Sequence, residues 1–310
     1  MPANVETMFY VRETPWHGLG TKVMEAPTSK KALDLAGLNW AVTQKKLMSE
    51  DGDLVPGYRL NVRSTDQRIL GVVSDRYKVV QNDEAFAFTD ALLGEGVTYE
   101  TAGSLRGGRA IWILAKMPER YALFGDDVTP YMVFMNTHDG TGAIKVAMTP
   151  VRVVCQNTLN LALSSAKRSW ATNHMGDIAG KMEDARNTLV YATQYMQSLT
   201  LEVETLASKD LTKDDVYGLV TELFPTPDKA TDLQIKNLDK QRVDLTSRFF
   251  DAPDLQHVGM NAYRFVNAVS DFATHAAPLR MTVNYQDNLF AKTVEGHPVI
   301  DKAYELVQAL

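Results

Sequence analysis

Three apolar segments with glycine-containing turns between them limit the possible folds of this chain most strongly. Val97–Ser104, Ala110–Met117 and Val128–Asn136 are rich in residues that favour strands. An Arg-Gly-Gly-Arg turn at 106–109 follows the first segment, and a His-Asp-Gly-Thr-Gly turn at 138–142 follows the third. Because Asp-Gly is a strong hairpin signal, a returning strand is predicted right after it, at 143–148. Together these patterns predict an antiparallel sheet.

Helices are predicted on both sides of this sheet in the sequence. Asn82 is suited to cap a helix over about 82–93, which a glycine then ends. Thr149 and Pro150 are suited to the N-cap and first position of a second helix, over about 150–166. The otherwise irregular N-terminal part adds a short helix at 29–38 and a hairpin with strands at 58–63 and 69–73.

The pattern changes after residue 173, where helical periodicity with few breakers takes over. Helices are predicted at 180–206, 212–223, 233–250, 259–274 and 301–310. We therefore predict an α+β fold: an antiparallel sheet of three to five strands flanked by helices, followed by an all-helical C-terminal part. The predicted domains are residues 1–175 and 176–310.

Composition excludes several classes of protein. With 45% hydrophobic and 23% charged residues among 310, the chain is neither disordered nor fibrous. No apolar run approaches the roughly 20 residues that span a bilayer, and the N-terminus lacks the pattern of a secretory signal. The single cysteine, Cys155, excludes an internal disulfide and a Cys-rich zinc site, and it is best interpreted as a small buried side chain. We expect a cytoplasmic protein that contacts no membrane.

Charge is distributed unevenly along the chain. Residues 177–310 hold 20 acidic and 13 basic side chains, whereas residues 1–176 hold 18 acidic and 19 basic ones. Gly140–Gly176 contains no acidic residue at all, and Leu54–Val80 holds five basic residues against two acidic ones. These two basic windows are either ordinary solvated surface or places where a polyanion binds.

The predicted helix after Pro150 combines several groups suited to phosphate. Arg152, Gln156 and Asn160 are four residues apart and would share one face, with Lys167 about two turns further on. Arg and Lys neutralise phosphates, and amides donate hydrogen bonds to phosphates or to base edges. The alternative is an amphipathic helix whose polar face is simply solvated.

Other motifs carry weaker signals. Arg106 and Arg109 flank two glycines, which is typical of a plain hairpin turn, and the alternative is that they clamp a phosphate at a strand tip. His138 and Asp139 are either a hairpin turn or part of a functional site. The chain has no P-loop, no GxSxG motif and no His spacing typical of a metal site, so we expect no cofactor, no metal and no catalytic residue.

Several of these motifs together resemble a known family. The segments Thr149–Leu163 (TPVRVVCQNTLNLAL), Asn136–Gly140 (NTHDG), Thr101–Arg109 (TAGSLRGGR) and Tyr77–Phe86 (YKVVQNDEAF), with WHGLG near the start and the Asn-Ala-Val of 267–269, resemble the phage/plasmid-like protein family, also called domain of unknown function 932. The resemblance covers most of the chain. It implies a bacteriophage, prophage or plasmid origin, and hence a bacterial host, but no settled activity.

The predicted topology is also similar to that of single-strand annealing proteins, namely the Red-beta, RecT and Erf proteins of phages and the eukaryotic Rad-type ring. In those rings, single-stranded DNA lies in a basic groove between a sheet and the following helix. That similarity implies a DNA-binding groove here, and an oligomeric ring or filament. Its candidate residues are Lys145, Arg152, Lys167, Arg168, Gln156, Asn160, Arg106 and Arg109, with Arg63 and Arg68 as weaker additions.

Three hypotheses follow for the function. The leading one is an ATP-independent protein of a mobile element that binds single-stranded DNA and anneals strands, acting as a homo-oligomer, with Tyr99, Trp112 or Tyr131 stacking on bases. The second is a non-enzymatic phage accessory protein whose acidic helical region binds a host or defence factor. The third is an enzyme or small-ligand binder built around His138, Asp139 and Arg152.

Overall fold

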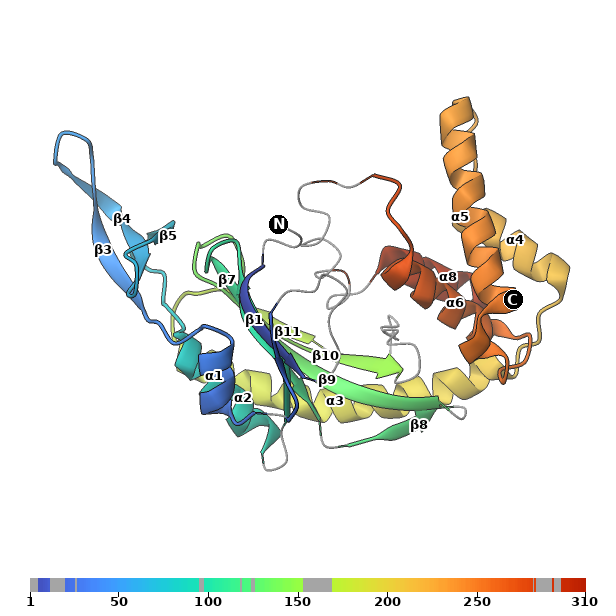
Figure 1. Cartoon of the computed structure of the whole chain (residues 1–310), viewed down its shortest axis with the longest axis horizontal. Coiled ribbons are helices and arrows are strands. Elements are labelled where there is room, and N and C mark those ends of the chain that lie inside the picture. Colours follow the sequence, from blue (N-terminus) through green and yellow to red (C-terminus); the bar gives the residue numbers. More distant parts are fainter. Residues whose placement is uncertain are drawn as a thin grey trace. The chain divides into compact units, whose positions relative to one another are not determined.

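The computed structural model describes residues 5–11, 20–25, 27–94, 98–117, 119–123, 126–152, 169–280, 282, 292 and 297–310. The chain divides into two compact units, which we treat separately. The first unit comprises residues 1–119, 130–148 and 168–192, and the second comprises residues 120–129, 149–167 and 193–310. Strands and helices occur in the order shown in Figure 1. The prediction of two domains divided at 175/176 stays a prediction.

A mixed sheet forms the centre of the first unit. Within the described residues it has eight strands, seven of them in the order β11-β10-β9-β7-β6-β1-β2, with β8 pairing on β9. Their bounds are β1 Val5–Val11, β2 Thr21–Val23, β6 Thr98–Leu105, β7 Ala110–Lys116, β8 Tyr121–Leu123, β9 Asp126–Thr137, β10 Ile144–Arg152 and β11 Ser169–Thr172. The four predicted strands β6, β7, β9 and β10 are confirmed.

The sheet is larger than predicted, and it is mixed. β1 pairs antiparallel with β6, and β2 pairs parallel with β1. The prediction of three to five antiparallel strands was therefore wrong in size and in type. The reason is that β1 joins a partner more than 90 residues away in sequence, a pairing that local periodicity does not reveal.

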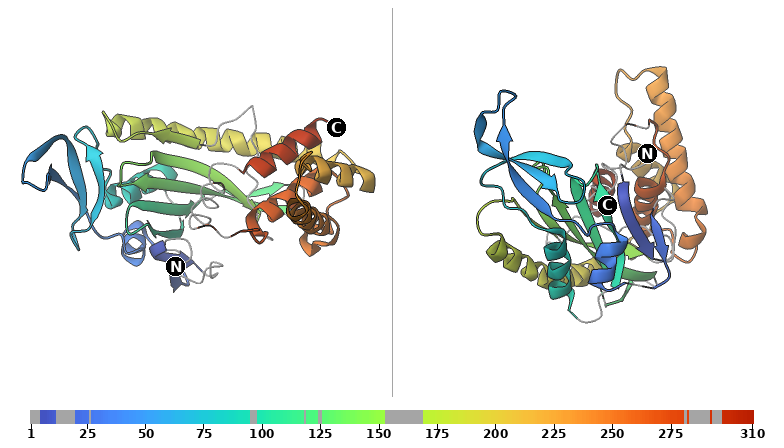
Figure 2. Two further views of the ribbon diagram at one scale, coloured as in Figure 1. Left: turned by 90° about the horizontal axis from the view of Figure 1, so that it is seen from above. Right: turned by 60° about the vertical axis from the view of Figure 1, so that its left-hand side comes forward.

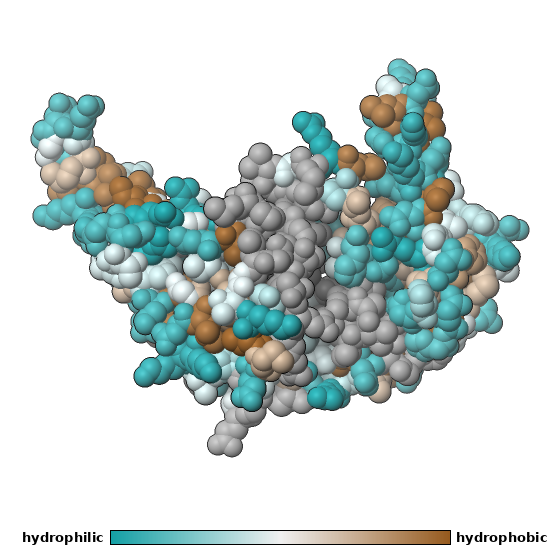
Figure 3. All heavy atoms as spheres, in the orientation of Figure 1, coloured by the Kyte–Doolittle hydropathy of each residue, from teal (hydrophilic) through white to brown (hydrophobic). Residues whose placement is uncertain are grey.

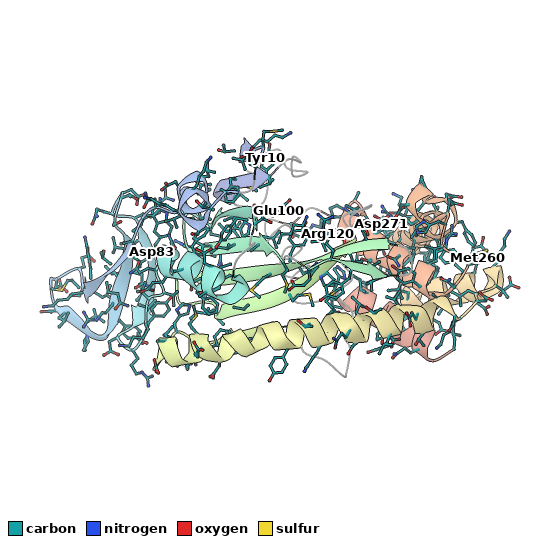
Figure 4. All side chains as sticks on the ribbon, turned by 90° about the horizontal axis from the view of Figure 1, so that it is seen from below. Tyr10, Asp83, Glu100, Arg120, Met260 and Asp271 are labelled. Atoms are coloured by element: carbon teal, nitrogen blue, oxygen red, sulfur yellow. The ribbon has the colours of Figure 1, made fainter. Side chains whose placement is uncertain are left out.

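One face of this sheet is covered by helix. On β7 and β9, Ile113 pairs with Phe134, and both side chains are almost fully buried. The ring of Phe88 in α2 (Asn82–Leu93) packs 5.7 Å from that of Phe134. α2, which begins next to the labelled Asp83, and the first part of α3 (Ile178–Ala207) lie on the same side of the strands (Figures 1 and 4).

A three-stranded antiparallel sheet projects from the same unit, and we call it the arm (Figures 1 and 2). It consists of β3 (Val42–Met48), β4 (Leu54–Arg63) and β5 (Ile69–Ser74). The predicted hairpin is confirmed as β4 and β5. β3 was not predicted, because its Thr-Gln-Lys-Lys segment alternates weakly and it lies at an edge.

Two helix starts differ from the expectations. Gln81, rather than Asn82, is the N-cap of α2, and its backbone N–H donates to the Glu84 carboxylate at 2.8 Å. The helix predicted to start at Pro150 was wrong at its start, because β10 continues to Arg152. β11 pairs with β10 only from Ile144 to Ala147, so Pro150 lies beyond these pairs, where a missing N–H is tolerated.

The second unit contains the C-terminal helices that were predicted, and it also includes β8, the first residues of β9 and the last residues of β10. Besides the end of α3 it contains α4 (Lys213–Leu223), α5 (Asp232–Asp251), α6 (Ala262–His275) and α8 (Pro298–Gln308), with a short 3-10 turn at Pro253–Leu255. α6 packs on α5 and α8, and nearly all of its first nine residues are fully buried. The short helix predicted at 29–38 is α1 (Ser29–Leu35) of the first unit. No helix in the described part of the chain has the length and apolar character needed to cross a membrane.

Candidate nucleic-acid interface

The acid-free window, Gly140–Gly176, supplies one edge of the mixed sheet. Its described parts include the strand pair β10–β11, at the end of the strand order. Ile144 and Val146 point into the core and are fully buried. Trp170 pairs with Val146 and Lys145 pairs with Ala171, and both Trp170 and Lys145 are half-buried. This edge therefore offers a cation on one face of the sheet and an aromatic ring on the other, with no carboxylate of its own window.

The second basic window, Leu54–Val80, meets this edge. The backbone N–H of Lys78 donates to the carbonyl oxygen of His174 at 2.7 Å, and Nδ1 of His174 lies 3.0 Å from the Lys78 carbonyl oxygen. The Tyr77 ring stacks on the His174 imidazole with centroids 4.5 Å apart, and its hydroxyl donates to the Thr137 carbonyl at 2.5 Å. Both windows thus meet within the first unit, and Arg76 and Lys78 are exposed beside the contact.

A buried polar cluster lies next to this contact. It consists of Asn82, Asn136 and His138, each 1% exposed or less. Nε2 of His138 is 3.0 Å from Oδ1 of Asn82, whose amide donates to the Leu38 and Trp40 carbonyls. The Asn136 amide donates to the Val80 carbonyl at 3.0 Å. Asn136 of β9 and His138, just after that strand, therefore fix the path of the segment leading into α2.

The histidines of this region are held neutral. Burial lowers the pKa of His138 to about 3, helped by the nearby His174, and burial also lowers the pKa of His174. Nδ1 of His138, Nε2 of His174 and Oδ1 of Asn136 are buried without a hydrogen-bond partner among the described residues. The edge of the Trp40 ring packs on His138 at 5.5 Å. The His138 ring is therefore buried between Asn82 and Trp40.

The arm docks on the two glycine turns that the sequence singled out. A Cβ on Gly71 of β5 would lie only 2.5 Å from the Cα of Asp139, so backbone meets backbone there. A Cβ on Gly108 would lie 2.9 Å from an amino nitrogen of Arg63. The Asn61 amide also donates to the His138 carbonyl at 2.7 Å. Both turns therefore serve as docking surfaces for the arm.

Arg63 is held inside this docking contact. Its guanidinium lies 2.8 Å from Glu6 and 2.6 Å from Asp66, and it stacks over the Trp40 ring. Hydrogen bonds to Asp66 and then Glu6 raise the pKa of Arg63, and those from Arg63 lower the pKa of Asp66. Arg68, half exposed, is 3.2 Å from Glu6. Both arginines are thus neutralised by carboxylates.

The remaining predicted site residues fall into two groups. Arg106 is partly exposed, 3.7 Å from Asp139, whose side chain is largely buried, and Arg109 is exposed. Arg152 ends β10, on the strand that carries Lys145. Gln156, Asn160, Lys167, Arg168 and Cys155 lie outside the described residues.

The aromatic candidates also separate. Tyr99 is buried, with its hydroxyl donating to Asp90, and Trp112 is buried in the sheet. Tyr131 is half-buried on β9. Sequence reasoning missed Trp170, Arg76 and Lys78 as site residues. Trp170 lies within the acid-free window, so the window itself was the signal that could have identified it.

The described residues include no group of three or more His, Cys, Asp or Glu side chains placed to hold a metal ion. The polar cluster has one imidazole and two amides.

Comparison with protein families identifies the chain. A family model described as "Domain of unknown function (DUF932)" matches residues 69–294. The chain belongs to this family. Searches of curated proteins and of solved structures gave no match. The DUF932 match includes Lys78, the polar cluster and the β10–β11 edge, and it begins at the first residue of β5.

Proposed function

We propose that this DUF932 protein binds single-stranded DNA and anneals complementary strands without ATP. The observation that supports this most directly is the meeting of the two basic windows at Lys78 and His174. The windows are distant in sequence, and one of them lacks acidic residues entirely. A surface on which cations outnumber carboxylates attracts a phosphate backbone.

The chemistry of this surface suits a single strand. Arg76, Lys78 and Lys145 supply positive charge, and Trp170, on the sheet face opposite to that of Lys145, supplies a partly exposed ring at the sheet edge. Base stacking on an aromatic ring contributes about 1–3 kcal/mol per base and tolerates any sequence. A strand held by its backbone keeps its base edges available for a complementary strand, which is the requirement for annealing.

Arg63 and Arg68 are not part of this proposed surface, because Glu6 and Asp66 neutralise them. Arg106 has Asp139 beside it, whereas Arg109 is exposed and remains in the proposal. Arg152, Gln156, Asn160, Lys167 and Arg168 also remain in it, on the strength of the sequence.

The test is a salt titration of binding to a labelled mixed-sequence oligonucleotide, single-stranded and duplex. We expect tighter binding of the single strand than of the duplex. The slope of the logarithm of the binding constant against the logarithm of the salt concentration should fall in magnitude by about one unit for each phosphate contact removed. Lys78→Ala lowers the slope, and Trp170→Ala weakens binding roughly tenfold without changing the slope.

Lys236→Ala is the matched control, an exposed lysine on α5 of the second unit. No binding at low salt, or an equal effect of Lys236→Ala and Lys78→Ala, contradicts the proposal. Annealing is read separately, as the rate at which two complementary labelled strands pair with and without the protein. Binding without an increased rate removes the annealing part alone.

A specific observation supports a second candidate, an accessory role through a protein partner. On α5, Leu233 and Val243 are each nearly 70% exposed, and Ile235 is also exposed. Charged side chains of both signs surround them along the helix: Asp232, Lys236, Asp239, Lys240 and Asp244. If the oligonucleotide titration fails, a protein ligand of this helix is the function to pursue.

A further inference from the structure

We propose that one face of the arm belongs to the path of the bound single strand, and that Lys46 of β3 and Arg59 of β4 bind its phosphate backbone. The inference rests on the proposed function and deepens it, because it adds two phosphate contacts on an element that contributes no residue to the surface described so far.

Lys46 and Arg59 form a pair of like charges, which we call the cation pair. They are directly opposite each other in the β3–β4 register. Opposite residues of an antiparallel pair project to the same face of the sheet, and two like charges placed in this way are destabilising. Both side chains are exposed, and in the described part of the chain neither has an ion-pair partner. An anion bound between the two side chains would relieve this repulsion.

The cation pair lies on the face of the arm that docks on the mixed sheet. Gln44 and Asn61 pair two residues further along the same strands, so alternation puts them on the same face as the cation pair. The Gln44 amide donates to the Tyr77 carbonyl at 3.3 Å, and the Asn61 amide donates to the His138 carbonyl at 2.7 Å. The cation pair therefore projects on the side of the mixed sheet, just beyond these docking contacts.

The cation pair is also close to the two basic windows where they meet. On its other side Arg59 pairs with Val73 of β5, and a Cβ on Gly140, the first residue of the acid-free window, would lie 3.0 Å from a methyl carbon of Val73. Ser74, the next residue, begins a turn that contains the exposed Asp75–Arg76. A phosphate backbone held beside this turn is therefore within reach of the cation pair.

The opposite face of the arm has a different chemistry. Leu60 pairs with Lys45 on one side and with Val72 on the other, so these three residues share the face that the cation pair does not use. The Lys45 amine donates to the side-chain oxygen of Gln67 at 2.6 Å, and Val72 is half exposed. Figure 3 shows a hydrophilic tip on the arm and a hydrophobic patch below it. Lys45, next to Lys46 but on the other face, is therefore a matched control.

The tip of the arm limits where the strand can run. Three exposed carboxylates lie in the turn between β3 and β4, namely Glu50, Asp51 and Asp53. Phosphates are repelled by carboxylates and attracted by the cation pair. The strand is therefore expected to cross the arm at the cation pair and not to follow it to the tip.

The experiment repeats the oligonucleotide salt titration on the full chain. Lys46→Gln and Arg59→Gln are each expected to lower the magnitude of the slope by about 0.7 to 1 unit, and the double variant by about twice as much. Lys45→Gln is expected to leave the slope unchanged, and so is Lys46→Arg, which keeps the charge. Because Lys46→Gln removes a repulsion, its thermal unfolding transition is expected to stay equal or rise, which shows that the variant is folded.

Equal changes of slope in Lys46→Gln and Lys45→Gln overturn the inference, because a general loss of positive charge then explains both. Unchanged slopes in Lys46→Gln and Arg59→Gln overturn it as well, and they leave the proposed function standing if Lys78→Ala still lowers the slope. A wild-type chain that binds no oligonucleotide at low salt overturns both proposals.

A last variant tests the path of the strand. Glu50→Gln with Asp51→Asn removes two carboxylates of the tip, and we expect equal or tighter binding of the single strand. Weaker binding in this variant contradicts the path, because the tip would then be a contact of the strand.

Discussion

The junction between the arm and the mixed sheet and the core around α6 are held together by different physical means. At the junction, buried amides, a neutral histidine and a paired arginine set the contact. Around α6, apolar side chains such as Phe265, Val266 and Val269 are buried with almost no exposure. The junction depends on the direction of its hydrogen bonds and on the protonation of its histidine, whereas the α6 core depends on the volume of its packed side chains. Polar contacts therefore fix how the arm is placed, and apolar packing supplies bulk stability.

The largest expected effect is in the α6 core. Phe265→Ala removes a fully buried ring that packs against Phe249, and we expect a loss of about 3–5 kcal/mol in the free energy of unfolding. Urea denaturation followed by circular dichroism measures it. The loss is expected to be the same at pH 8 and pH 5. The matched control is Leu233→Ala, at an exposed position of α5, with an effect within about 0.5 kcal/mol. A loss that changes steeply with pH contradicts the distinction between the two regions.

The next effect is at the junction. Arg63→Ala leaves Glu6 and Asp66 with only the half-exposed Arg68 as a partner and removes the stacking on Trp40, so we expect a loss of about 2–3 kcal/mol. Arg68→Ala removes a half-exposed partner of the same two acids and costs less than about 1 kcal/mol. Urea denaturation compares the two variants directly. Equal losses are inconsistent with a buried role for Arg63.

The smallest effect appears as a pH dependence. The folded-state pKa of His138 is lowered to about 3 from an ordinary value of 6.5, so the unfolded chain binds a proton that the folded chain does not. Stability contributed by the neutral ring is fully present above pH 6.5 and falls by up to about 1.4 kcal/mol for each pH unit below it. His174 adds to this loss in the same direction, because its pKa is also lowered.

His138→Asn is expected to reduce this slope between pH 6.5 and pH 5, a range above the ordinary pKa values of Glu6 and Asp66. Phe265→Ala is expected to keep the full slope, since it alters the α6 core alone. The measurement is the free energy of unfolding at four or five pH values. An unchanged slope in His138→Asn shows that another group provides the pH dependence.

Local signals in the sequence predicted most of the elements. The glycine turns at 106–109 and 138–142 located β6, β7, β9 and β10, and caps such as Thr212 located the helices of the second unit. These features depend on neighbouring residues only. The pairing of β1 with β6 joins partners far apart in sequence, so periodicity did not reveal it. The edge strand β3 pairs with its neighbour β4, but its alternation is too weak to mark it as a strand. Pro150 misled the prediction, because proline suits the first turn of a helix and also an unpaired position of a strand.

The candidate site was predicted in part. Charge counting found both basic windows, but it did not show that Lys78 and His174 join them. It also could not separate Arg63, which carboxylates neutralise, from the exposed Arg76 and Lys78 nearby. Sequence order hides ion pairing across a fold. Glu6, which pairs with Arg63, is 57 residues away.

The most direct test of the central claim, that the joined basic windows hold single-stranded DNA, is amide hydrogen exchange with and without a bound oligonucleotide. We expect added protection in two separate peptides at once, one covering Arg76 and Lys78 and one covering β10 and β11. Peptides of α5 would keep their exchange rates. Protection confined to α5, or no added protection at a saturating oligonucleotide concentration, contradicts the account.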